Sequence, residues 1–188
     1  MAATWSRHRE GDLTLDDHVQ LVATLRAAYP RYADKFTGRR SWFGARPEVR
    51  VLARDGDQVA AHAGVIRRFI EVEDGNGART ERLVGIVGLV AVHPDRAGAG
   101  LGRTLMEHTA DLLHEMRVPF GILLCGDDVR GFYRACGWQA RPGTSWTLAF
   151  DPWDPEVHHH PVPVMVLPVA GDLDKWPSGD LHWHCQQV

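Results

Sequence analysis

Apolar residues recur along this chain with two spacings, one typical of helices and one typical of strands. Residues 14–29 show the helical spacing: Thr14 is placed to cap the helix, and Asp16 and Asp17 suit its positive end. Four apolar residues of this helix are expected to share one face: Val19, Val22, Leu25 and Tyr29. Strands are predicted at 49–54, 58–72, 83–92 and 118–124, with turns at 55–57 and 74–77.

The same pattern continues to the end of the chain. It predicts helices at 101–116 and 129–136, and strand regions at 138–150 and 162–169. Residues 30–47 are expected to form a loop or short helix, and residues 151–161 and 171–188 loop or edge material. Because strands and helices are interspersed, without a repeat or a linker, the chain is predicted to be one mixed α/β domain, 1–188.

Composition narrows the class of protein. The chain has 188 residues, of which 44% are hydrophobic and 24% charged, as in an ordinary soluble domain. A net charge of −3 argues against a nucleic-acid partner. No apolar run reaches membrane-spanning length, and residues 1–6 do not resemble a signal peptide. The three cysteines form no C-x-x-C motif, so we expect a reduced, cytoplasmic protein.

One segment carries the strongest functional signal. An apolar strand pattern ends at His93-Pro94, three glycines follow at 98, 100 and 102, and a helical pattern begins at once. A helix N-terminus preceded by a glycine turn presents backbone N–H groups to an anion. The lysine of a P-loop is missing at position 103, and the spacing is not that of a dinucleotide fold. A pyrophosphate site is therefore predicted, although a plain tight turn is the alternative.

The order V-x-V-x-P-x-x-x-G-x-G-x-G resembles the acyl-CoA loop of the GNAT N-acyltransferases. The resemblance implies a GNAT fold: a mostly antiparallel mixed α/β sheet with one splayed parallel strand pair and flanking helices. It implies acetyl-CoA, or another acyl-CoA, as co-substrate and no metal. The residues expected to bind it are Val90, Val92, Ala97, Gly98, Ala99, Gly100, Leu101, Gly102 and Arg103. The usual loop begins with Gln or Arg, which is Ala97 here, but backbone N–H groups carry most of the anion binding.

A second motif lies about thirty residues further on. Phe132-Tyr133 followed by Gly137-Trp138 resembles the F-Y-x-x-x-G-F/W segment of the same superfamily. The resemblance implies that Tyr133 protonates the departing thiolate as a general acid. The alternative is a core aromatic residue on a short helix.

A closer resemblance covers most of the chain. Residues 40–50, 60–70 and 166–179 are similar to the nodulation protein NodA family, which N-acylates the amino-sugar end of a chitin oligosaccharide using an acyl carrier protein. Residues 123–138 instead resemble aminoglycoside 2′-N-acetyltransferases, and Tyr133, which the NodA family lacks, favours an acyl-CoA user. Where those acetyltransferases carry a glutamate on the central strand, this chain has Gly88.

The proton acceptor for the amine is not decided by the sequence. His62 follows two alanines on a predicted strand and titrates near neutrality, but a buried histidine satisfied by a backbone carbonyl explains it equally well. Glu48, Asp127 and Asp128 are further candidates, as is a water relay; the two aspartates are expected to cap the following helix. Trp42 and its aromatic neighbours would line an acceptor groove or belong to the core. The histidines at 158–160, 182 and 184 lack a second ligand cluster, so no metal site is predicted.

These observations predict an acetyl-CoA-dependent N-acetyltransferase in which a primary amine attacks the thioester directly. The acceptor partner is expected to be a small amine, an amino sugar or an antibiotic carrying one; no nucleic acid or membrane partner is expected. One alternative is a NodA-like transfer of a longer acyl chain from CoA or a carrier protein, and another is a non-catalytic acyl-CoA-binding module. Tyr133 and His62 are the predicted catalytic residues; Trp42, Glu48, Asp127 and Asp128 are the predicted acceptor residues. A homodimer is one open alternative for the oligomeric state.

Overall fold

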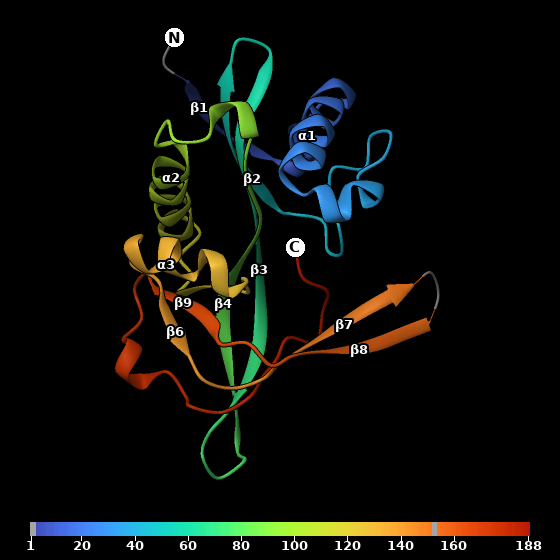
Figure 1. The fold of residues 1–188 in the computed structure, drawn as a ribbon. Coiled ribbons are helices and arrows are strands. Elements are labelled where there is room, and N and C mark those ends of the chain that lie inside the picture. Colours follow the sequence, from blue (N-terminus) through green and yellow to red (C-terminus); the bar gives the residue numbers. More distant parts are fainter. Residues whose placement is uncertain (1–2, 152–153) are drawn as a thin grey trace. The chain divides into compact units, whose positions relative to one another are not determined.

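A computed structural model describes residues 3–151 and 154–188 (Figure 1). The chain divides into two compact units: Met1–Ile66 with Val87–Thr109 and Val188, and Arg67–Ile86 with Ala110–Gln187. Strands β3 (Gln58–Glu73) and β4 (Arg79–Val92) and helix α2 (Leu101–Glu115) contribute residues to both units. The single domain over 1–188 stays a prediction. Among the described residues no helix is long and apolar enough to cross a membrane.

The first unit is built on three antiparallel strands. Strand β1 (Thr4–Arg9) pairs with β2 (Val49–Asp55), and β2 pairs with β3, as expected for a hairpin around residues 55–57. The register sets Ser6 opposite Leu52 and Leu52 opposite His62, with an irregularity after Ala53. His62 therefore lies on β3 where that strand pairs with β2, and its side chain is fully buried.

Helix α1 (Leu15–Ala28) begins as predicted. Thr14 caps it in a reciprocal capping box: the Asp17 N–H donates to the Thr14 hydroxyl, and the Thr14 N–H donates to the Asp17 carboxylate. Leu21, Val22 and Leu25 are buried, whereas Val19 is 43% exposed, so the expectation that Val19 shares the apolar face is wrong. Buried His18 and Thr24 take part of that face instead, because each has a hydrogen-bond partner: the Ser41 hydroxyl and the Val59 carbonyl. The short helical turn η2 (Pro30–Lys35) follows α1 directly (blue in Figure 1).

The second unit contains one mixed sheet in the order β6-β9-β5-β4-β3-β10-β7-β8. Its strands are β5 (Phe120–Leu123), β6 (Gln139–Arg141), β7 (Ser145–Asp151), β8 (Asp154–His160), β9 (Val164–Pro168) and β10 (Leu181–His182). The pair β4–β5 is parallel over Val84–Ile86, and β5–β9 and β7–β8 are antiparallel. The expected parallel pair in a mostly antiparallel sheet is therefore present. Figure 1 shows β7 and β8 (orange) as a two-stranded arm.

Small residues allow helix α2 to lie close to this sheet. A Cβ atom built on Gly121 would come within 2.7 Å of Leu113 and 3.1 Å of Trp138, and one on Gly85 would overlap Leu113. Leu113 and Trp138 are almost fully buried, so these glycines are positions of close packing rather than turns. The helix α3 (Asp127–Ala135) completes the unit together with the helical turn η4 (Leu173–Lys175).

Three strands were not predicted, and one predicted region is divided. Strand β1 and strand β8 are rich in charged residues and histidines, and β10 has only two residues, so none shows the apolar alternation of a strand. The predicted strand region 138–150 is divided into β6 and β7, because Gly143 at φ = 114° lies against the Gly179 backbone and breaks the extended run.

Candidate active site

The glycine loop joins strand β4 to helix α2 within the first unit. After Val92 the chain makes the helical turn η3 (Pro94–Arg96), and α2 then begins at Leu101. Gly98 and Gly100 both have φ = 78°, a conformation that side chains disfavour, and both are exposed with open space where a Cβ would be. The Gly100 carbonyl accepts from the N–H of Arg103, so the helix starts at the loop itself.

Two contacts fix the start of this loop. The Ala97 N–H donates to the Pro94 carbonyl at 3.0 Å, and Arg96 forms an ion pair with Asp55 at the β2–β3 hairpin. The first turn of any helix leaves N–H groups without an intrahelical acceptor. Loop and helix thus present backbone donors beside two glycines, the arrangement that the sequence predicted for an anion. Donor binding by these residues stays a prediction.

Strand β4 contains a left-handed residue just before the loop. Leu89 has φ = 53°, which is rare for a branched residue inside a strand. Its carbonyl accepts a hydrogen bond from His62 Nδ1 at 2.8 Å, and the next carbonyl, of Val90, accepts from the Tyr29 hydroxyl at 2.5 Å. Two consecutive strand carbonyls are thus bound by side chains, and the strand returns to β3 where the His93 N–H donates to Ala60.

His62 is neutral and has both ring nitrogens engaged. The Leu89 carbonyl can only accept, so Nδ1 carries the proton; Arg50 can only donate, so Nε2 accepts from Arg50 Nη1 at 3.1 Å. Burial, together with the positive charge of Arg50, lowers the pKa of His62 to about 3. This geometry favours the structural one of the two alternatives that the sequence left open for His62.

A buried ion pair completes the network around His62. Arg50 is fully buried; its Nε donates to Glu10 Oε2 at 2.5 Å and its Nη1 to the Ser41 carbonyl at 2.9 Å. Glu10, in the helical turn η1 (Glu10–Asp12), also accepts from Arg46 at 2.7 Å. Burial raises the pKa of Glu10, but the hydrogen bonds and charges of Arg50 and Arg46 outweigh it and hold that pKa below its ordinary value.

Trp42 and Glu48 lie near this network in the first unit. The Arg46 guanidinium lies 4.6 Å from the Trp42 ring, and the His18 ring meets the same indole edge-on at 6.1 Å. Glu48 is half-buried, and its backbone bonds both Val65 and Glu10. These two predicted acceptor residues are therefore grouped with the buried pair, not scattered over the surface.

The other predicted site residues lie on α3, in the second unit. Tyr133 is 8% exposed and packs between the rings of Phe132 and Trp138, at 5.2 and 6.2 Å. Asp127 and Asp128 are exposed in the first turn, and Asp127 forms an ion pair with Arg130. The expectation that these aspartates cap the helix is wrong, because Gly126 occupies the N-cap position and no side-chain hydrogen bond caps the helix.

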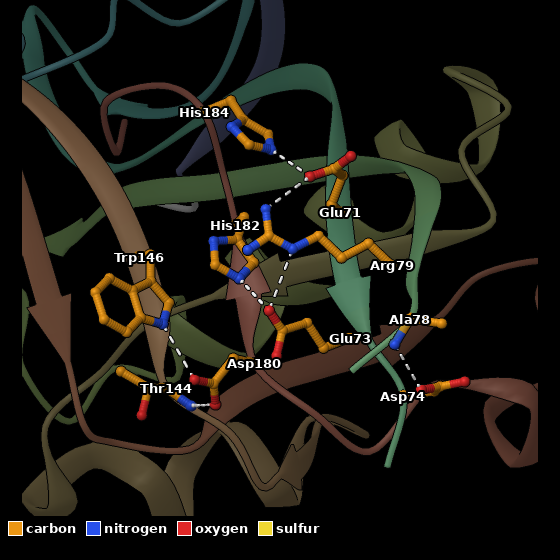
Figure 2. Close-up of polar contacts among 10 residues, drawn as sticks. All are labelled: Glu71, Glu73, Asp74, Ala78, Arg79, Thr144, Trp146, Asp180, His182 and His184. Atoms are coloured by element: carbon orange, nitrogen blue, oxygen red, sulfur yellow. Dashed lines mark hydrogen bonds and ion pairs between the residues drawn. The ribbon is translucent and has the colours of Figure 1, made fainter. Parts of the chain in front are cut away.

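The C-terminal histidines are bound by carboxylates (Figure 2). His182 Nε2 lies 2.9 Å from Glu73, and His184 Nε2 lies 2.9 Å from Glu71. Arg79 joins the same two glutamates at 3.2 and 3.4 Å. These histidines therefore belong to a polar ladder across β3, β10 and the following residues, and the described part of the chain contains no group of three or more His, Cys, Asp or Glu residues that could hold a metal.

Gly88 has a packing role in this chain. A Cβ at Gly88 would overlap the Val188 carbonyl, and one at Gly64 would come within 3.2 Å of the Val188 side chain. Because neither glycine has a Cβ, residue 188, which is 8% exposed, packs against the strands of the first unit. The position where the resembled acetyltransferases carry a glutamate is therefore filled by another part of the chain.

Sequence reasoning missed Glu10, Arg50 and the conformation of Leu89. The charges lie on a polar segment and on an apolar strand, where one sequence offers no sign that they meet. A leucine gives no warning of positive φ either, because that conformation is normally signalled by Gly or Asn. The one available signal was the arginine within the apolar run Val49–Ala53, since a strand expected to be buried should not carry an unpaired charge.

Solved structures define the fold class. The chain superposes on the GNAT family N-acetyltransferase YhbS from Escherichia coli, solved in complex with CoA, with a TM-score of 0.61 at 18% identity, covering 98% of this chain and 91% of that one. It superposes on a GNAT acetyltransferase from Brucella melitensis, in complex with acetyl-CoA, with a TM-score of 0.57 at 18% identity, covering 96% of each chain. The fold is that of the GNAT N-acyltransferases.

The family model for nodulation protein A (NodA) matches residues 1–182. Nodulation protein A from Mesorhizobium sp. (strain 7653R) is 34% identical over 96% of this chain and 94% of its own. The relative from Bradyrhizobium sp. (strain NC92) is 35% identical over 93% of this chain and 86% of its own. The chain belongs to the NodA family, and with this fold it is an N-acyltransferase enzyme.

Proposed function

We propose that this protein transfers an acyl chain from a phosphopantetheine thioester to the primary amine of an amino sugar, as a NodA-like N-acyltransferase. Membership of the NodA family favours this alternative over acetylation of an antibiotic, the main prediction from the sequence. The proposed binding of the acyl donor rests on one observation, the strand–glycine-loop–helix segment, in which Gly98 and Gly100 both have φ = 78° and are open to solvent.

Residues of the first unit suit a pyrophosphate or phosphate of the donor. The backbone N–H groups of Gly98, Gly100, Leu101 and Gly102 would bind the anion. The positive end of α2 would favour its charge, and the Arg103 side chain is exposed beside them. Acyl-CoA and acyl carrier protein offer the same phosphopantetheine thioester. They differ in the nucleotide of CoA and in the protein surface of the carrier, so the donor assay must include both.

The reaction needs no covalent enzyme intermediate. The amine nitrogen attacks the thioester carbonyl carbon, a C–N bond forms, and the C–S bond breaks. The nitrogen loses one proton, and the departing thiolate takes one, for which Tyr133 is the proposed donor. Direct attack therefore requires one proton acceptor and one proton donor.

His62 is not the proposed acceptor of the amine proton. The lone pair of its neutral ring is on Nε2 and already accepts from the buried Arg50. A pKa of about 3 also makes the imidazole a weak base at neutral pH. Protonation would also place a second positive charge beside Arg50 without solvent access. Glu48, Asp127, Asp128 or a bound water are the remaining candidates for the base.

Trp42 supports an amino-sugar acceptor. Its indole is half-buried and lies next to Arg46, whose guanidinium is 54% exposed in its side chain. An aromatic ring offers its face to the C–H groups of a sugar, and a carboxylate such as that of Glu48 suits an ammonium group. The acceptor half of the proposal depends on Trp42 and Glu48.

A donor and acceptor matrix tests the proposal. Thiol release would be measured with acetyl-, decanoyl- and palmitoyl-CoA and with acyl carrier protein, each against glucosamine, a chitin oligosaccharide with a free terminal amine, and kanamycin. Turnover with a long-chain donor and the oligosaccharide supports the NodA-like function. Turnover confined to acetyl-CoA and kanamycin would favour the antibiotic-modifying alternative instead.

A binding measurement separates an inactive protein from a wrong acceptor. If calorimetry shows acyl-CoA binding but no amine gives thiol release, the non-catalytic module is the better description. If neither CoA nor carrier protein binds, the glycine loop does not hold the donor and the proposed function fails.

A further inference from the structure

We infer that the buried chain Glu10–Arg50–His62 is a positioning device that holds Leu89 in its left-handed conformation and so sets the course of strand β4 at the donor site. The inference rests on the proposed function in one respect: the thioester is taken to lie against the strand that leads into the glycine loop. Its structural part is independent of that function. It concerns only residues of the first unit.

The first step is the conformation of Leu89. A non-glycine residue with positive φ is strained, and such residues persist only where their surroundings over-determine them. Leu89 is only 8% exposed. The His62 Nδ1–H donates to that carbonyl at 2.8 Å, which makes His62 the group that stabilises the turned peptide.

The second step is the tautomer of His62. A neutral imidazole carries its proton on one of two nitrogens, and the bond made by the other nitrogen decides which. Arg50 Nη1 donates to Nε2 at 3.1 Å and thereby keeps the proton on Nδ1, facing Leu89. Arg50 is held in turn by Glu10 Oε2 at 2.5 Å and by the Ser41 carbonyl at 2.9 Å.

The third step is the consequence for the site. A left-handed residue in a strand turns the adjoining peptide groups out of the regular ladder. The Val90 carbonyl accepts a hydrogen bond from the Tyr29 hydroxyl at 2.5 Å. Val90 and Val92, the predicted donor-binding residues of β4, follow directly, so the conformation at 89 decides where their backbone groups point.

A matched pair of substitutions tests the device. The amide of asparagine can replace the Nδ1 donor, whereas the longer glutamine can replace the Nε2 acceptor but not the donor to Leu89. We expect His62→Asn to keep most of the turnover and a positive φ at Leu89. His62→Gln should lower kcat by roughly five- to one-hundred-fold, as strain of this size implies, with φ at Leu89 turned negative in its crystal structure.

Rescue provides the sharpest readout. Glycine adopts positive φ without strain, so the double variant His62→Gln/Leu89→Gly should recover most of the kcat lost in His62→Gln, measured against Leu89→Gly alone. Two results would overturn the inference. One is equal loss in the Asn and Gln variants without rescue, which indicates chemistry at His62. The other is a lower melting temperature with unchanged kcat per folded molecule, which indicates a packing role only.

The outcome is separable from that of the proposed function. If the parent enzyme neither binds acyl-CoA nor turns over, the proposed function fails, and kcat says nothing about Leu89. The φ angle of residue 89 in the crystal structures of the Asn and Gln variants still decides the inference. A Gln variant that keeps Leu89 left-handed refutes it whatever the activity.

Discussion

Lowering the pH should destabilise the parent protein more than it destabilises a variant whose side chain at position 62 cannot ionise. Burial and the Arg50 charge lower the pKa of His62 to about 3, compared with about 6.5 in an unfolded chain. The folded pKa lies below the unfolded one, so the stabilisation is present above pH 6.5 and is lost as the pH falls towards 3. The whole interval corresponds to about 5 kcal/mol, at about 1.36 kcal/mol per pH unit.

The pH range over which this loss of stability can be measured is narrower than the interval between the two pKa values. Between pH 7 and pH 5 the unfolded chain gains about 0.7 of a proton at this residue and the folded chain gains almost none. Integrated over that range, His62 alone removes about 2 kcal/mol of stability. That is a large part of a typical stability of about 5–15 kcal/mol. Glu10, whose lowered pKa lies below 4.5, contributes only at lower pH.

Urea unfolding followed by circular dichroism at pH 7, 6 and 5 measures the effect. Burial also lowers the pKa values of His18 and His160, so these residues contribute to acid destabilisation with the same sign. The parent must therefore be compared with His62→Asn and His62→Gln. Each variant should lose about 2 kcal/mol less than the parent between pH 7 and pH 5. His114→Gln, at an exposed position of α2, is the control and should behave like the parent. An identical pH dependence in the parent and both variants would mean that His62 is not held neutral by its surroundings.

Three further substitutions test other parts of the site. Gly100→Val should weaken acyl-CoA binding by at least about tenfold in calorimetry, because a branched residue at φ = 78° moves the loop backbone; Gly77→Val, at φ = 81° with equally open space, controls for strain, and equal affinity in both variants contradicts the loop assignment. Tyr133→Phe should keep donor affinity and lower kcat by up to ~10²–10⁴-fold in a thiol-release assay, and an unchanged kcat reduces Tyr133 to packing. Gly88→Ala should lower the melting temperature, since its Cβ overlaps Val188 and overpacking costs about 1–3 kcal/mol; a fully stable variant shows that residue 188 moves aside at no cost.

Much of the fold could be predicted because its signals are local. The Thr14 cap, the Asp55-Gly56-Asp57 turn and the start of α2 at Leu101 are fixed by residues within a few positions, and all three are present. Strand β8 was missed because its pairing with β7 sets Thr147 opposite His158 and Trp146 opposite His159, contacts that no alternation within residues 154–160 announces. Such strands form through cross-strand partners, which outweigh weak intrinsic preference.

In the candidate site, too, the features with local sequence signals could be predicted and the others could not. The glycine loop could be predicted because its function depends on backbone conformation, which Gly98 and Gly100 announce in the sequence. The surroundings of His62 could not, because Glu10 and Arg50 are 40 residues apart and meet only in the folded chain. A histidine between two alanines looks the same in sequence whether it faces solvent or a buried guanidinium, so its pKa cannot be predicted from its neighbours.

The adjacent pair Gly88-Leu89 explains why a side-chain network is needed at all. Glycine would adopt the left-handed conformation at 89 without support, yet the glycine stands one position earlier, where the approach of Val188 leaves no room for a Cβ. Leu89 is nearly buried and contributes its side chain to the core, which a glycine at 89 would forfeit. The strand therefore keeps a core leucine in a strained conformation, and the hydrogen bond from His62 offsets that strain. Rigidity at the entrance to the glycine loop thus depends on a polar chain that begins at Glu10, far from the loop in sequence.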